Sequence, residues 1–190
     1  MFGISRDAHQ NNDSTLGTID TCVFSDKVTQ GLSGLDKNEL SSHFLDIRRE
    51  LRGMQQIYHS CAVRMTTHKG ISTNIKLFRL DMDFKISTLK RKSMYITYRL
   101  AELTNFKKVD LHGLTLEESQ EVVILVIDQI LRSLSRSNSK RYDLEIVTGK
   151  GLHSDGDPVL HPRIKEFLQK EGYKPKSSKD EGKIEVAIIN

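Results

Sequence analysis

The chain has 190 residues, of which 37% are hydrophobic, and its two cysteines, Cys22 and Cys61, lie far apart in the sequence. This composition suits one domain with an extension, and it argues against a secreted protein held together by disulfide bonds. No apolar run reaches the length of a membrane span, and the first residues lack the apolar centre of a signal peptide. These features predict a cytoplasmic protein that contacts no membrane.

The net charge of +4 is unevenly distributed along the chain. Residues 1–70 carry eight Lys/Arg and eight Asp/Glu, residues 71–108 carry nine and three, and residues 109–190 carry twelve and fourteen. The positive excess therefore lies in one stretch, which can attract a polyanion such as nucleic acid or can simply be a solvated helix face. The residues that we consider for an auxiliary basic patch are Lys85, Lys90, Arg91, Lys92 and Arg99.

Hydrophobic periodicity divides the first half of the chain into two parts. Residues 1–36 are polar and show no sustained period, which predicts a flexible or loosely docked segment. From Leu40 to Met65, and again from Ile71 to Leu103, apolar residues recur at steps of three and four, with Gly70 between the two runs. Residues 37–106 are therefore predicted to form a helical hairpin with a basic second helix.

Residues 107–190 show the alternation that is typical of strands, interrupted by two helical patterns. Strands are predicted at 109–112 and 142–147, and two more in the last residues around an Asp-Glu-Gly turn. A capping box at Thr115 and Glu118 begins the first helix, and Asp157-Pro158 is expected to begin the second. The order β-α-β-α-β-β predicts an α/β (α+β) two-layer sandwich with a mixed four-stranded sheet.

Two motifs, Asp-Leu-His-Gly and Thr-Gly-Lys-Gly, follow the first and second strands of this sandwich. Strands in a β-α-β unit run parallel, so both motifs should emerge at the same edge of the sheet, where ligands commonly bind. The residues that we expect to converge there are Asp110, His112, Gly149, Lys150, Gly151 and His153.

The residues alone leave three interpretations of Asp110 and His112 open. The pair can hold the turn by hydrogen bonds, or His112 can act as a general acid or base with Asp110 as its partner. The third interpretation is a metal site completed by His153 or His161, although no compact ligand spacing supports it.

The glycine-containing motif departs from a Walker A loop, because Lys150 is followed by Gly151 and not by Ser or Thr. A tight turn is one interpretation of it. The other is an anion site, in which backbone amides, Lys150 and Arg163 of the next helix meet a phosphate.

The segments VDLHG, IVTGKGLHS, HPRIKEFL and GKIEVAI resemble the Smr (small MutS-related) domain, over residues 107–190. The resemblance implies the sandwich found in the C-terminal domain of translation initiation factor three, preceded by a helical extension like that of eukaryotic Smr proteins. It implies nucleic-acid binding and, in many members, endonuclease activity. It places the family's acidic and imidazole residues at Asp110 and His112, its glycine-loop residues at Gly149, Lys150, Gly151 and His153, and a basic residue at Arg163.

The resulting hypothesis is a monomeric RNA endonuclease module that cuts messenger RNA in ribosome-associated quality control, as the Smr endonucleases of no-go decay do. RNA and the ribosome are its expected partners, and the adjacent 2′-hydroxyl is the expected nucleophile, so neither a metal nor another cofactor is required. One alternative is a non-catalytic module that binds RNA or the ribosome, and a second is a DNA-nicking Smr domain.

Overall fold

The computed structural model describes residues 24, 26–66, 73–149, 159–178 and 182–189. The elements in chain order are α1 (Asp26–Thr29), α2 (Lys37–Thr66), α3 (Thr73–Glu102), β1 (Lys108–Asp110), α4 (Leu116–Ser135), β2 (Arg141–Val147), α5 (Leu160–Lys170), β3 (Lys176–Ser177) and β4 (Lys183–Ile189). None of the helices described is both long enough and apolar enough to cross a membrane.

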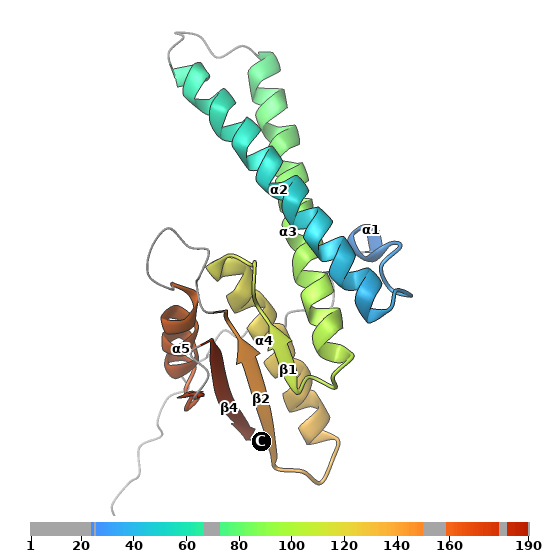
Figure 1. The fold of residues 1–190 in the computed structure, drawn as a ribbon, viewed down its shortest axis with the longest axis vertical. Coiled ribbons are helices and arrows are strands. Elements are labelled where there is room, and N and C mark those ends of the chain that lie inside the picture. Colours follow the sequence, from blue (N-terminus) through green and yellow to red (C-terminus); the bar gives the residue numbers. More distant parts are fainter. Residues whose placement is uncertain (1–23, 25, 67–72, 150–158, 179–181, 190) are drawn as a thin grey trace, which may run out of the picture.

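The four strands form one mixed sheet in the order β1-β2-β4-β3 (Figure 1). β1 and β2 are parallel, whereas β4 is antiparallel to both β2 and β3. Alternate residues of the long strands are buried in one core with apolar residues of α4 and α5. Examples are Leu144 and Ile146 on β2 and Ile184 on β4. The mixed four-stranded α+β sandwich predicted from the sequence is therefore confirmed.

The helices α2 and α3 form the predicted hairpin, and its distal part projects from the sandwich (Figure 1). Apolar residues at steps of three and four give each helix one apolar face, and Leu51 and Ile96 are almost fully buried where these faces meet. Near its C-terminus α3 packs on β1 and α4, and Met94 and Ala101 belong to the core of the sandwich. The hairpin and the sandwich thus share a hydrophobic core.

The short segment before the hairpin is packed more closely than its polar composition suggested. Val28 and Leu32 are about 5% exposed, and the ring of Phe24 makes an edge contact with Tyr95 of α3 at a centroid distance of 5.2 Å. These residues are therefore docked on the hairpin, whereas the flexible or loosely docked segment predicted for residues 1–36 stays a prediction as a whole. Residues 1–23 lie outside the described residues.

The predicted end of the first strand differs from the structure. β1 ends at Asp110 and not at residue 112, because the Asp110 side chain accepts a hydrogen bond from the His112 backbone and turns the chain there. α5 begins at Leu160, with Val159 at its N-cap and no side-chain cap. The prediction that Asp157 and Pro158 begin this helix falls on residues outside the described part of the chain.

Candidate nucleic-acid site at the carboxyl ends of β1 and β2

The ends of β1 and β2 lie side by side, as the β-α-β order predicts. Asp110 is opposite Val147 in the parallel register, and the next backbone amide, that of Leu111, donates to the Val147 carbonyl at 2.8 Å. The turn that follows β1 therefore leaves the sheet beside Thr148 and Gly149, which follow β2.

The turn after β1 exposes its two polar side chains and buries its aliphatic one. Leu111 is fully buried, whereas Asp110 and His112 are exposed. The Oδ1 atom of Asp110 accepts a hydrogen bond from the His112 backbone amide at 3.0 Å, and Gly113 has a φ of +83°, which favours glycine. Asp110 thus shapes the turn from which the His112 side chain projects.

The capping box predicted for α4 is present. Thr115 Oγ1 accepts from the Glu118 amide at 3.3 Å, and a Glu118 carboxylate oxygen accepts from the Thr115 amide at 2.6 Å. These reciprocal bonds fix the chain only three residues after His112.

The His112 imidazole lies against the first glycine of the second motif. A Cβ atom built on Gly149, whose φ is +76°, would lie 3.4 Å from His112 Cδ2. On its other side, Gly149 faces Gly182, because a Cβ built on Gly182 would lie 3.1 Å from the Gly149 carbonyl carbon. Gly182 also accepts from the Thr148 amide at 2.8 Å and from its hydroxyl at 3.1 Å. The chain before β4 therefore supports the start of the glycine motif.

The other residues predicted for this site are placed only in part. Lys150, Gly151 and His153 lie outside the described residues. Arg163 is exposed in the first turn of α5, where its guanidinium pairs with Glu166 at 3.3 Å. Its role as a phosphate ligand remains a prediction.

The sequence suggested His161 only as a metal ligand. In the structure, its side chain contacts the start of the second motif. Its Nδ1 is 3.2 Å from Thr148 Oγ1, and its Nε2 is 3.5 Å from Ser177 Oγ. The Lys165 ammonium also donates to Ser177 Oγ at 3.0 Å. The sequence did contain a signal for a role of His161 at this site. It is a histidine in the first turn of the helix that follows a glycine loop, and an anion binds readily at such a helix start.

The surroundings of His161 also lower the pKa of its imidazole. Burial, with a smaller contribution from the positive charge of Lys165, lowers the pKa of His161 below its ordinary value of 6.5. The imidazole is therefore neutral at physiological pH, and it gains a proton more readily in the unfolded chain than in the folded one.

This pKa shift predicts a loss of stability in mild acid. Because the unfolded chain binds more protons, the contribution of His161 is complete above pH 6.5 and decreases as the pH falls below that value. We expect His161→Gln to flatten the dependence of the free energy of unfolding on pH between pH 7.5 and 5.5, as measured by urea denaturation. An unchanged dependence would contradict the assignment, and His43→Gln on the exposed surface of α2 is the control.

The five residues of the predicted auxiliary patch occupy different faces of α3, as their spacing along the helix shows. Lys85, Lys92 and Arg99 recur every seven residues and share a face, where Lys85 pairs with Asp81 at 2.7 Å and Arg99 pairs with Glu102. Lys90 lies one turn before Met94, which packs in the core together with Leu111. Arg91 is exposed between these two faces. Lys90 is thus nearest in helical position to the part of α3 that contacts the sandwich.

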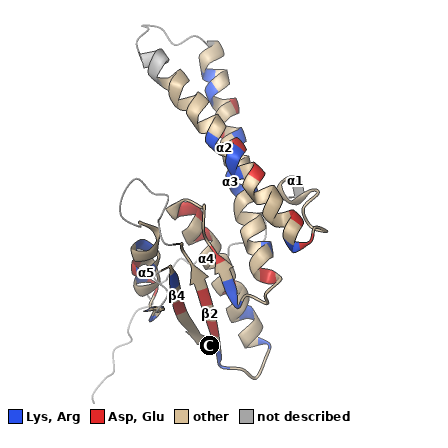
Figure 2. Ribbon diagram, viewed as in Figure 1, with Lys and Arg blue, Asp and Glu red and all other residues tan. Residues whose placement is uncertain are grey.

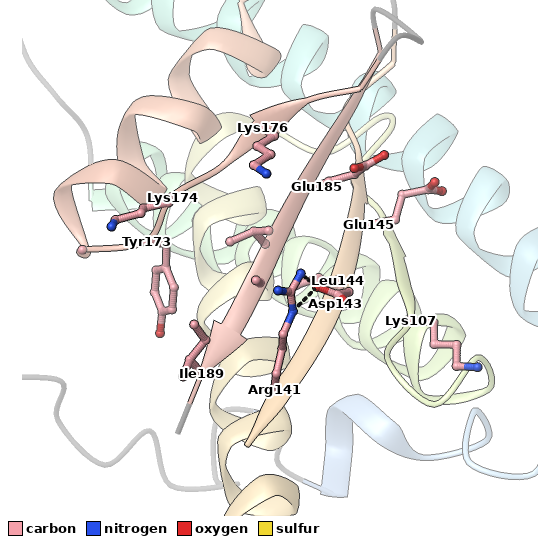
Figure 3. Close-up of a pocket in the computed structure, with 13 residues that line it drawn as sticks. Lys107, Arg141, Asp143, Leu144, Glu145, Tyr173, Lys174, Lys176, Glu185 and Ile189 are labelled. Carbon is pink, nitrogen blue, oxygen red and sulfur yellow. Dashed lines mark hydrogen bonds and ion pairs between the residues drawn. The ribbon is translucent and has the colours of Figure 1, made fainter. Parts of the chain in front are cut away.

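A shallow hollow of about 730 Å³ lies over the part of the sheet that α4 and α5 do not cover (Figure 3). Its lining mixes Lys174 and Lys176 with Glu145 and Glu185, and it contains the ion pair between Arg141 and Asp143. Neither Asp110 nor His112 lines this hollow. It is therefore separate from the candidate site.

Within the described part of the chain, no three His, Cys, Asp or Glu side chains are grouped so that they could hold a metal ion.

Comparison with known families identifies the domain that contains the site. The family model for the Smr domain matches residues 109–183, which include both strand-end motifs. Residues 109–183 are an Smr domain. The Smr family is nuclease-related and binds nucleic acid, which connects the chain with a nucleic-acid function.

Among solved structures, the chain is similar to the solution structure of the B3BP Smr domain, with 22% identity and a TM-score of 0.40. The match covers 51% of this chain and 91% of that one. A search of curated proteins found no match. Because the family model spans residues 109–183, the site described above lies in the Smr domain, at the carboxyl ends of its two parallel strands.

Proposed function

We propose that the chain is an RNA endonuclease module that cuts messenger RNA in the cytoplasm, during ribosome-associated quality control of the no-go-decay type. The observation that carries this proposal is the exposed His112 imidazole, which lies against Gly149 where two parallel strands of an Smr domain end. An imidazole beside a glycine-containing turn combines a proton acceptor with a backbone that can approach a phosphate closely.

In the proposed reaction, His112 accepts the proton of a ribose 2′-hydroxyl. The O2′ atom attacks the adjacent phosphorus, the bond from phosphorus to the 5′-oxygen breaks, and water gives the departing oxygen a proton. The products are a 2′,3′-cyclic phosphate and a 5′-hydroxyl. Amides of the glycine motif, together with Lys150 and Arg163, would stabilise the negative charge that develops on the phosphate oxygens.

A cleavage assay with two substrates tests this mechanism. Single-stranded RNA and the same strand with one 2′-deoxyribose at the cut position are incubated with the protein in EDTA. We expect RNA to be cut to a cyclic phosphate, and the deoxy position to remain intact. Equal cutting of both strands would refute the role of the 2′-hydroxyl, and cutting of an all-DNA strand would instead support the DNA-nicking alternative.

One observation favours a second function, in which the same surface binds RNA or the ribosome without cutting. The Asp110 carboxylate accepts a hydrogen bond from the His112 backbone amide, which is the contact expected if this carboxylate only holds the turn. Tight RNA binding with no cutting of free or ribosome-bound messenger RNA would support this second function.

The basic second helix gives a prediction about affinity. The described part of the Smr domain has exposed acidic as well as basic residues, so we expect α3 to supply much of the attraction for RNA (Figure 2). Replacing Lys90, Arg91 and Lys92 together with glutamine should reduce the slope of log K against log salt concentration, by roughly 0.7 for each of the three side chains that contacts a phosphate of a single strand.

The matched control for this prediction removes the same charge at the opposite edge of the sheet. Arg136, Lys140 and Arg141 are exposed near the amino end of β2, and replacing them with glutamine should leave the slope nearly unchanged. Equal slopes for the wild type and the α3 variant would contradict the proposed role of the basic helix.

A further inference from the structure

The helix α2, which lies outside the Smr domain, contacts the turn that carries His112. A Cβ atom built on Gly113 would lie 3.5 Å from Cε1 and 3.7 Å from Cζ of Phe44, so the phenyl ring lies directly over this glycine. Gly113 has a left-handed backbone conformation and immediately follows His112. A ring in this position limits the space through which a flexible glycine turn can move.

One turn further along α2, Arg48 contacts the cap of α4. Its NH1 nitrogen lies 2.9 Å from each carboxylate oxygen of Glu118, and the two side chains are only 12% and 3% exposed. Glu118 is the same residue that closes the capping box with Thr115. Arg48 therefore compensates the buried charge that fixes the chain just after the His112 turn.

We propose that Phe44 and Arg48 are positioning residues for His112, so that contacts from α2 fix the position of the imidazole in the site. The turn is held at its start by the hydrogen bond between Leu111 and Val147 and at its end by the capping box. Between these two points lie His112, Gly113 and the buried Leu114, whose amide donates to the Leu111 carbonyl at 3.1 Å. Phe44 packs over Gly113. The Smr domain of residues 109–183 by itself lacks both contacts from α2.

This inference rests on the proposed function only where it concerns RNA cutting. Whether Phe44 and Arg48 position the His112 ring can be measured on the imidazole itself. The readout is the chemical shift and the pKa of the His112 ring in the full chain by NMR, with His112→Ala for assignment. The variants are Arg48→Met and Phe44→Ala. Their matched controls are the neighbouring Arg49→Met and Leu45→Ala, because Arg49 is 74% exposed and Leu45 is 60% exposed.

We expect the His112 and Gly113 signals to move in Arg48→Met and in Phe44→Ala, and to stay in place in both controls. In the cleavage assay, kcat should fall by roughly tenfold or more while KM changes little, since a misplacement of about 1 Å at a catalytic group can cost up to ~100-fold. Both Arg48 contacts come from one nitrogen, so Arg48→Lys should restore most of the wild-type signal positions.

Two results would overturn the inference. The first is a set of unchanged His112 and Gly113 signals in folded Arg48→Met and Phe44→Ala. The second is an equal change in the control variants. If Arg48→Met does not fold, as judged by circular dichroism, Phe44→Leu decides the question by the same signals. A wild type that never cuts RNA would refute the proposed function, and the NMR comparison would still decide whether α2 positions His112.

Discussion

His112→Ala should abolish most RNA cutting while RNA binding remains. General acid–base catalysis by a positioned side chain typically contributes about 10²–10⁴-fold, so we expect the cutting rate to fall by that factor. His112 is exposed, so we expect the fold to be unaffected. The measurement is cleavage of 5′-labelled single-stranded RNA in EDTA, with the wild type and the variant at equal occupancy.

Two substitutions of Asp110 separate its charge from its hydrogen bond in the same assay. Asp110→Asn keeps an oxygen that can accept from the His112 amide, whereas Asp110→Ala removes it. Loss of cutting in both variants would assign a role to the carboxylate charge. Loss in Asp110→Ala alone would assign Asp110 to holding the turn. Full cutting by His112→Ala would exclude the imidazole from the reaction.

Arg48→Met should lower the free energy of unfolding by about 3 kcal/mol, because removing one partner of a buried ion pair leaves the other charge uncompensated. Glu118 is 3% exposed and its carboxylate is also part of the helix cap, so it cannot move into solvent without breaking the capping box. Urea denaturation of the full chain measures this loss. Arg49→Met on the exposed side of α2 should change the free energy by less than about 0.5 kcal/mol.

A second substitution identifies the cause of this loss. Glu118→Gln removes the carboxylate charge and keeps an oxygen that can accept from the Thr115 amide. The double variant Arg48→Met/Glu118→Gln should therefore be more stable than Arg48→Met alone, since no unpaired charge is buried. A double variant that is less stable than either single variant would show that packing of the Arg48 stem, and not charge, is the important contribution.

The parts of the fold that depend on periodic or local signals could be predicted from the sequence. The hairpin follows from apolar residues at steps of three and four, and the start of α4 follows from the capping box. The position of Asp110 and His112 beside the second motif follows from β-α-β order, which makes the two strands parallel. These signals require no knowledge of distant contacts.

The contacts that could not be predicted join residues that are far apart in the chain. Arg48 and Glu118 are 70 positions apart, and a charged residue on a long helix reads as solvent-exposed until its buried partner is known. His161 was undervalued because its contact with Thr148 depends on how α5 packs on the sheet, which periodicity does not specify. The end of β1 was placed two residues late because the side chain of Asp110 competes with the strand ladder.

The projecting hairpin separates its distal end from the Smr domain (Figure 1). Its distal end exposes Leu77, Leu80 and Phe84, which are 59–72% exposed and recur at steps of three and four along α3. Leu80 is 14 residues from Met94, which belongs to the same core as Leu111, and 1.5 Å per residue makes this separation about 20 Å. Under the proposed function, a partner bound to this exposed end would lie at a set distance from His112, so the place of a cut would be measured from that partner and not from the RNA sequence.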